Sequence, residues 1–130
     1  MKIKIPISTG ELVDKLTILD VKLENITDEE KLKEVRHEKE ELEKPYNHFT
    51  GLVAEELSLL RDMLYQVNRG LWGIEDDIRE CERQKDFGPK FIRLARDVYY
   101  TNDKRFEIKN KINKITNSDI KEVKSYESYS

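Results

Sequence analysis

The chain has 130 residues, a length that fits one domain built around a single hydrophobic core. Lysine and arginine number 24 against 27 aspartates and glutamates, and because the two signs alternate along the chain, generic nucleic-acid binding is disfavoured. Charged residues make up 39% and hydrophobic residues 37%, so each helix should have one solvated face and one buried stripe.

The first residues predict a short extended segment followed by a helix. Residues 3–7 alternate isoleucine with lysine or proline, which is typical of a brief strand that lies on the bundle or pairs with another chain. Ser8 and Glu11 have the spacing of a capping box. Apolar residues then recur at steps of four and three and predict a helix over residues 9–25 (Leu12, Leu16, Leu19, Leu23, Ile26).

A second, strongly charged helix is predicted to follow. Thr27 and Glu30 repeat the capping-box spacing, and Pro45 should stop or kink the helix. Few apolar residues lie between them, so we expect this helix to be largely solvated and only partly anchored.

The third helix has the strongest pattern and should begin after Gly51. Its apolar residues form a heptad seam with unbroken steps of four and three: Val53, Leu57, Leu60, Leu64, Val67, Leu71, Ile74, Ile78 and Cys81. Burial of each side chain is worth roughly 1.5–3 kcal/mol, so packing along this seam should dictate the fold. Gly70 and Gly73 flank Trp72 and predict a close backbone approach or a bend.

A fourth helix is predicted from Pro89 to about Asn117, after a turn at residues 86–88. Its apolar positions are Phe91, Leu94, Ala95, Val98, Ile108, Ile112 and Ile115. We therefore expect an all-α antiparallel bundle of about four helices, with a long hairpin of the third and fourth helices and a short extended N-terminal segment. Residues 1–117 should form a single helical domain, and residues 118–130 a polar tail.

Cysteine usage and hydropathy indicate a cytoplasmic protein. The lone Cys81 cannot form an intramolecular disulfide, and with only His37 and His48 the chain lacks the spacing of a zinc site. The first residues lack the apolar core of a secretory signal, and no stretch approaches membrane-spanning length. We expect Cys81 to be a core thiol, the histidines to be exposed, and the protein not to bind membranes.

Polar residues interrupt the apolar stripe of the fourth helix. Asn102 and Arg105 stand where the spacing predicts inward-facing side chains, and a buried unpaired polar group costs roughly 1–3 kcal/mol. Asp14 or Asp20 on the first helix could pair with Arg105. Two interpretations stay open, a structural network or a binding site for a small anion, and neither needs a cofactor. The candidate ligand-binding residues are Asp14, Lys15, Thr17, Asn102, Arg105 and Lys109.

Carboxylates one helical turn apart suggest an alternative chemistry. Glu38 and Glu41 form one such pair, Asp77 and Glu80 form another, and facing helices could bring both pairs around Mg²⁺. All-helical nucleoside triphosphate pyrophosphohydrolases use this arrangement, although the gap between the pairs is longer here than that family's pattern suggests. Acidic helix faces more often pair with lysine or arginine one turn away.

Two segments together resemble a known family: GELVDKLTIL at residues 10–19 and TNDKR at residues 101–105. The family consists of uncharacterised short helical proteins from bacteria and from phages of marine bacteria, and its bacterial members are often encoded near surface-polysaccharide glycosyltransferases. The resemblance spans nearly the whole chain and implies membership without an established activity. The matching positions are Gly10, Glu11, Asp14, Lys15, Thr17, Thr101, Asn102, Asp103 and Arg105.

The predicted helix lengths indicate self-association. A third helix of about 33 residues would span roughly 50 Å, about twice the reach of the first helix. Apolar residues on its flanks, such as Leu52, Leu59, Met63 and Trp72, would then need a second copy of the chain as cover. The sequence thus predicts a non-catalytic accessory or binding module that forms a homo-oligomer, preferably a homodimer, and binds a small anionic ligand or a protein partner.

Overall fold

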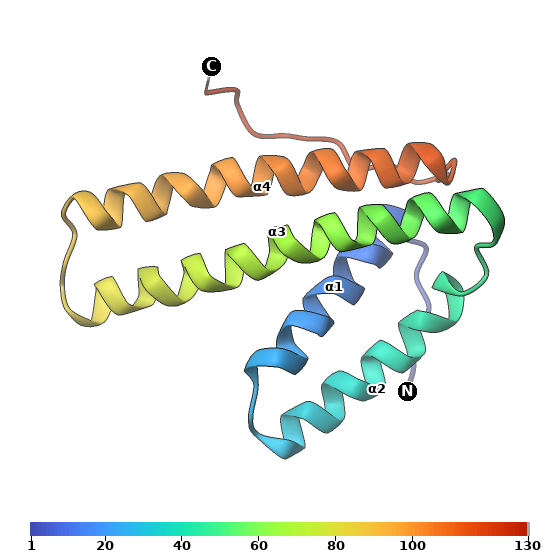
Figure 1. Cartoon of the computed structure of the whole chain (residues 1–130), viewed down its shortest axis with the longest axis horizontal. Coiled ribbons are helices and arrows are strands. Elements are labelled where there is room, and N and C mark those ends of the chain that lie inside the picture. The colour runs from blue at the N-terminus through green and yellow to red at the C-terminus, as the bar shows by residue number, and fades with distance from the viewer. Residues whose placement is uncertain (130) are drawn as a thin grey trace.

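The computed structural model describes residues 1–129 and contains, in that range, the helices α1 (Thr9–Asn25), α2 (Glu29–Tyr46), α3 (Gly51–Arg83) and α4 (Pro89–Ile115) (Figure 1). The helices pack against one another, so the predicted all-α bundle of four helices is confirmed. Within residues 1–129, no helix is both long and apolar enough to cross a membrane.

Capping residues explain where the first two helices begin. Ser8 caps α1 as predicted, because its Oγ accepts a hydrogen bond from the backbone N–H of Glu11 at 3.0 Å. At α2 the prediction is wrong by one residue: the cap is Asp28 instead of Thr27, and its carboxylate accepts hydrogen bonds from the first turn. The helix ends one residue after Pro45, in agreement with the predicted stop.

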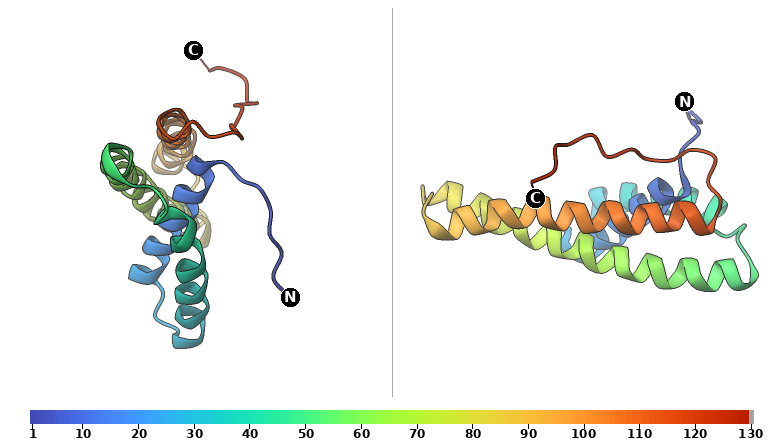
Figure 2. Two further views of the ribbon diagram at one scale, coloured as in Figure 1. Left: turned by 90° about the vertical axis from the view of Figure 1, so that its right-hand side faces the viewer. Right: turned by 90° about the horizontal axis from the view of Figure 1, so that it is seen from above.

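Two helical hairpins build the fold. α3 and α4 run antiparallel and form the longer hairpin, while α1 and α2 form a shorter one (Figures 1 and 2). α1 packs against both α3 and α4, and α2 packs on α1. The turn between α3 and α4 extends beyond the shorter hairpin, so this end of the molecule is only two helices thick (Figure 1).

The core lies where α1 meets the longer hairpin. Val13, Leu57, Leu64, Ile108 and Ile112 form one cluster, and each of them is at most 7% exposed. Half-buried side chains extend this cluster at its edges: Tyr46, Phe49, Leu60, Val67 and Ile115. Because each buried aliphatic side chain contributes roughly 1.5–3 kcal/mol, the cluster fixes how the two hairpins meet.

The heptad seam of α3 is confirmed as an inward stripe, except at its first position. Leu57, Leu64 and Cys81 are buried, and Val53 is 37% exposed. The other five members are half-buried: Leu60, Val67, Leu71, Ile74 and Ile78. Val53 lies in the first turn of α3, at the edge of the core. The burial of Cys81 confirms the predicted core thiol.

Two local predictions are wrong, the close approach at Gly70 and Gly73 and the strand at residues 3–7. Among the described residues, a Cβ atom on Gly70 or Gly73 would meet no atom within 4 Å, so the two glycines mark no close approach. The alternative, a bend, stays a prediction. Residues 3–7 form no strand, and Ile3 and Ile5 are 74% and 68% exposed. The backbone N–H and C=O groups of a single extended segment form their hydrogen bonds with water. Pairing of this segment with another chain stays a prediction.

The C-terminal tail runs back along α4 (Figures 1 and 2). Residues 118–129 contain no helix. Ser118 fixes the start of this segment, because its Oγ accepts a hydrogen bond from the Thr9 backbone N–H at 3.2 Å and donates one to the Ile120 carbonyl at 2.7 Å. The tail therefore begins beside the first turn of α1.

Candidate functional site

α1 and α4 approach closely at Gly10. Its backbone N–H donates a hydrogen bond to Asn113 Oδ1 at 2.7 Å, and a Cβ atom built on Gly10 would lie 2.6 Å from the carbonyl oxygen of Lys109. A side chain here would collide with the backbone of α4, so Gly10 sets the distance between the two helices. In the sequence Gly10 stands out only as a motif position, whereas the close approach is predicted at Gly70 and Gly73.

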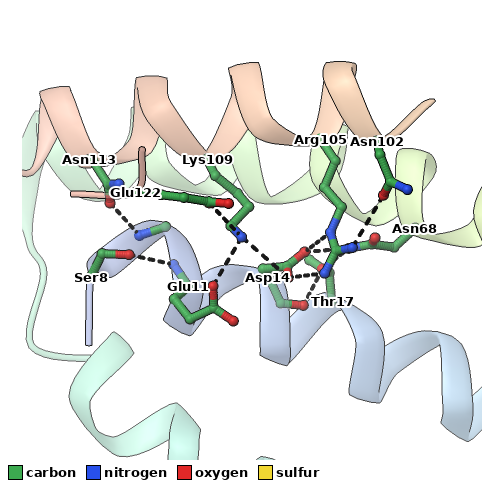
Figure 3. A network of polar contacts seen from close by, with 11 residues as sticks. Ser8, Glu11, Asp14, Thr17, Asn68, Asn102, Arg105, Lys109, Asn113 and Glu122 are labelled. Atoms are coloured by element: carbon green, nitrogen blue, oxygen red, sulfur yellow. Dashed lines mark hydrogen bonds and ion pairs between the residues drawn. The ribbon is translucent and has the colours of Figure 1, made fainter. Parts of the chain in front are cut away.

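One turn further along α1, Asp14 is bound by Arg105 of α4 (Figure 3). Nε of Arg105 donates to Oδ1 at 2.9 Å and Nη2 donates to Oδ2 at 2.5 Å, the fork geometry of a guanidinium on a carboxylate. The hydrogen bonds to Asp14 raise the pKa of Arg105 although burial opposes this shift. The predicted pair with Asp14 is thus confirmed, whereas Asp20 pairs with Lys39 and Arg61.

α3 contributes Asn68 to the same carboxylate. Its Nδ2 donates to Asp14 Oδ1 and to Thr17 Oγ1, both at 2.9 Å, and Thr17 Oγ1 donates to the Asp14 carbonyl at 2.8 Å. Asn68 is not among the residues predicted from the sequence. Its position does give a signal, because it follows Leu64 by four residues and precedes Leu71 by three, which places it on their inward face.

Lys109, one turn after Arg105, brings a second cation to the site (Figure 3). Its Nζ lies 3.0 Å from Glu11 Oε2, 2.8 Å from Glu122 Oε1 and 3.9 Å from Asp14 Oδ2. Burial alone would lower the pKa of Lys109, but the hydrogen bonds to Glu122 and Glu11 outweigh it and the pKa is raised. These residues form what we call the Asp14 network: Glu11, Asp14, Thr17, Asn68, Arg105, Lys109 and Glu122.

The tail also contacts α4 further from the network. Lys124 Nζ pairs with Asp103 Oδ1 at 2.5 Å. A hydrogen bond between Asp103 and the hydroxyl of Tyr129 raises the pKa of Tyr129 to about 12. The ring of Tyr129 packs on Tyr99 and Tyr100, with centroid distances of 5.3 and 4.9 Å. Several contacts therefore hold the tail on α4.

Two of the predicted ligand-binding residues lie outside the Asp14 network. Lys15 is exposed on α1 and lines a cavity beside the N-terminal segment. Asn102 is exposed as well, contrary to its predicted inward orientation, and its Oδ1 accepts a long hydrogen bond of 3.4 Å from Arg105 Nη1. The long side chain of Arg105 bridges to Asp14 and fills the gap in the apolar stripe of α4, which leaves Asn102 at the surface.

A cleft of about 490 Å³ opens beside the network, between α1, α3 and α4. Its lining combines Asn68 and Arg105 of the network with the amide of Asn102, the ring of Trp72 and three further charged residues: Glu75, Asp76 and Arg79. The volume falls in the range of about 300–1,000 Å³ that is usual for small-molecule sites. Arg79 Nε lies 3.8 Å from Glu75 and its side chain is 72% exposed, so this cation is only loosely paired. We call this feature the α1–α3–α4 cleft.

The carboxylate pairs of the hydrolase interpretation are not brought together. Glu38 and Glu41 lie on α2, which packs on α1, whereas Asp77 and Glu80 lie toward the far end of α3 (Figure 1). Arg61 of α3 forms an ion pair with Glu43 of α2 and so marks where α2 meets α3. Asp77 lies roughly 24 Å from Arg61 along the axis of α3, at 1.5 Å per residue. Among residues 1–129, no group of three or more His, Cys, Asp or Glu side chains is placed to hold a metal ion.

The fold and the site define an all-helical protein whose first and last helices are joined by a buried carboxylate–guanidinium network. Residues 1–129 match a family described as a family of unknown function (DUF6165), and the chain belongs to this family. The expected membership of an uncharacterised family is thereby confirmed. Neither a search of curated proteins nor a search of solved structures found a match.

Proposed function

We propose that this chain is a non-catalytic binding module that acts as a homo-oligomer and holds a sugar phosphate or nucleotide in the α1–α3–α4 cleft. The lining of the cleft carries the proposal. Trp72 offers an aromatic face to a sugar ring or a base. Glu75 and Asp76 can accept hydrogen bonds from sugar hydroxyls, and Arg79 and Arg105 can donate to a phosphate.

Binding without turnover is supported by the pairing within the Asp14 network. Both carboxylate oxygens of Asp14 accept hydrogen bonds from Arg105, so this buried acid is not placed to act as a general base. Arg105 retains donor capacity, because the hydrogen bond from its Nη1 to Asn102 Oδ1 is long at 3.4 Å and Nη1 carries a second N–H. Because Arg105 lines the cleft, this remaining capacity can serve a ligand.

The biological setting is part of the same proposal. We place the protein in the cytoplasm of a bacterium or a phage-infected cell, in line with its lone cysteine. The GELVDKLTIL and TNDKR segments resemble proteins encoded near surface-polysaccharide glycosyltransferases, which use sugar nucleotides. A ligand of that chemistry suits the cleft.

A protein partner is the second candidate occupant, and the magnesium-dependent hydrolase gains no support from the separated carboxylates.

Fluorescence of Trp72 gives a local test, because this is the only tryptophan in the sequence. We expect at least one member of a panel of UDP-glucose, GDP-mannose, UMP and glucose 1-phosphate to change its emission and raise Tm. Arg79→Ala should weaken that binding about tenfold, or about 1.4 kcal/mol. Arg93→Ala, which removes an exposed arginine of α4 outside the cleft lining, should leave it unchanged.

Two results would overturn this proposal. If no member of the panel changes the fluorescence of Trp72 or the Tm, the cleft is not a site for these ligands. If a nucleoside triphosphate is consumed with release of pyrophosphate or phosphate in the presence of Mg²⁺, the module is catalytic and the hydrolase alternative replaces the binding one.

A further inference from the structure

The tail places a carboxylate on a buried cation. Glu122 Oε1 lies 2.8 Å from Lys109 Nζ, and the side chain of Glu122 is 40% exposed whereas that of Lys109 is 7% exposed. We propose that Lys109 and Arg105 form a phosphate subsite, and that Glu122 occupies it in this structure in place of a ligand's phosphate group. The identity of the complete ligand rests on the proposed function, but the subsite can be tested by itself.

The charges around the subsite balance without Glu122. Glu11 and Asp14 supply two carboxylates, which balance the two cations Arg105 and Lys109. Glu122 adds a third carboxylate, so the cluster carries a net charge of minus one with the tail in place. Because charge balance does not require Glu122, another anion can take its position without leaving a buried charge unpaired.

A phosphate fits the two cations better than a carboxylate does. Arg105 and Lys109 are one turn apart on α4, so their side chains leave the same face of the helix. Within the described chain Glu122 pairs with Lys109 and not with Arg105, although its charge contributes to the raised pKa of Arg105. Arg105 and Lys109 line the same cavity, and a phosphate has three peripheral oxygens, so one phosphate there can accept hydrogen bonds from both side chains.

Space for an entering anion exists between the tail and α4. A cavity of about 390 Å³ lies there, and its lining includes Asn102, Arg105, Lys109 and tail residues 122–126. Asn102 and Arg105 also line the α1–α3–α4 cleft, so the two cavities share these residues. A phosphate on the subsite would therefore lie next to a sugar or base held in the cleft.

The exchange does not require the tail to leave the protein. Lys124 pairs with Asp103, and the ring of Tyr129 packs on Tyr99 and Tyr100, and none of these contacts involves Glu122. These contacts hold the tail near α4 while Glu122 moves aside. The tail thus keeps a competing carboxylate at high local concentration beside the subsite.

Inorganic phosphate is the probe for the subsite, and the full-length chain is the sample. Glu122→Gln removes the competing charge and keeps the side chain's size. If Glu122 fills the subsite about 90% of the time, this substitution should tighten phosphate binding about tenfold. Glu127→Gln is the matched control, because Glu127 is exposed in the same tail and has no ion pair among the described residues. We expect it to bind phosphate as the wild type does.

The ¹³Cε signal of Lys109, titrated by NMR at constant ionic strength, locates the bound phosphate without a substitution in the buried network. We expect this signal to shift with phosphate and not with chloride. Two results would overturn the inference: equal phosphate affinity in the wild type and in Glu122→Gln, or a Lys109 signal that does not shift with phosphate in either protein. The Glu122–Lys109 pair would then be a structural ion pair only.

The same samples separate this inference from the proposed function. If Lys109 responds to phosphate while Trp72 ignores every sugar nucleotide, the subsite stands and the proposed function fails. If Trp72 responds to a sugar nucleotide while Lys109 stays silent, the proposed function stands and the subsite is disproved.

Discussion

A carboxylate that is 1% exposed is tolerated at Asp14 because its oxygens are bonded from two directions. Arg105 donates to both oxygens and Asn68 adds a further donor to Oδ1. An isolated buried carboxylate would cost several kcal/mol, so each partner protects the fold against an uncompensated charge. For Asp14 this geometry supports the structural interpretation. For Arg105 it is compatible with both interpretations, since the side chain also lines the α1–α3–α4 cleft.

Gly10→Ala should destabilise the protein. The added Cβ would lie 2.6 Å from the carbonyl oxygen of Lys109, so α1 and α4 would have to separate and the bond from Gly10 to Asn113 would stretch. Overpacking of this kind typically costs about 1–3 kcal/mol. We expect a loss of that size in the free energy of unfolding, measured by urea denaturation followed by circular dichroism.

Gly70→Ala is the matched control for Gly10→Ala. Gly70 lies inside α3, and a Cβ there would meet no atom within 4 Å. Alanine favours a helix interior over glycine by about 0.5–1 kcal/mol, so this substitution should stabilise the protein. Opposite signs for the two substitutions are the expected result. Equal effects would contradict the close approach at Gly10.

Some residues of the site could be predicted from the sequence and others could not. Arg105 was predictable because it breaks an apolar stripe, and Asp14 because it lies beside the seam of the first helix. Asn102 breaks the same stripe and yet is exposed, whereas the longer side chain of Arg105 reaches Asp14. Asn68 joins the network from α3, and Glu122 from the tail, through contacts that spacing along one helix does not reveal.

At the level of helices, α2 is held less firmly than the other three. Val35 is its buried residue, and the rest of the helix is half-buried or exposed. Arg61 of α3 contacts α2 in two ways. Its Nη2 forms an ion pair with Glu43 Oε1 at 2.7 Å, and its guanidinium carbon lies 4.6 Å from the ring centroid of Tyr46. These contacts bury little apolar area, so α2 should open more readily than the core helices.

Native-state hydrogen exchange tests this difference. We expect the amides of α2 to exchange through a partial opening of the protein. The free energy of this opening should be at least about 2 kcal/mol lower than that for the amides around Leu64, a difference equal to the burial of one aliphatic side chain. The measurement is amide exchange by NMR at several low urea concentrations. Equal protection of α2 and of the central turns of α3 would show that the four helices unfold as one unit.

The bounds of the helices were predictable where local signals set them. The apolar period and the Ser8 cap define α1, and the heptad seam defines α3 from Gly51 onward. The strand expected at residues 3–7 does not form in the described chain, because a strand needs a partner edge that no local pattern supplies. The spacing of residues along the sequence therefore predicted the helices more accurately than it predicted the contacts between segments.

On the scale of the whole molecule, residues 1–129 leave one face of α3 without a cover. Leu52, Leu59 and Met63 are 77%, 67% and 48% exposed, and their spacing of seven and four residues places them on one face. The core cluster around Leu57 and Leu64 occupies another face of the helix. Exposed apolar residues aligned in this way are typical of a surface that binds another protein, and a second copy of the chain is the partner that the helix lengths predict.

We therefore expect a homodimer at micromolar concentration, measured by size-exclusion chromatography with light scattering. Leu59→Glu should convert it to a monomer, because a buried carboxylate without a partner would oppose association. Ser58→Glu adds the same charge at the neighbouring exposed position, about 100° away around α3, and should leave the mass unchanged. A monomeric wild type would contradict self-association, and a dimer that persists in Leu59→Glu would place the interface on another surface.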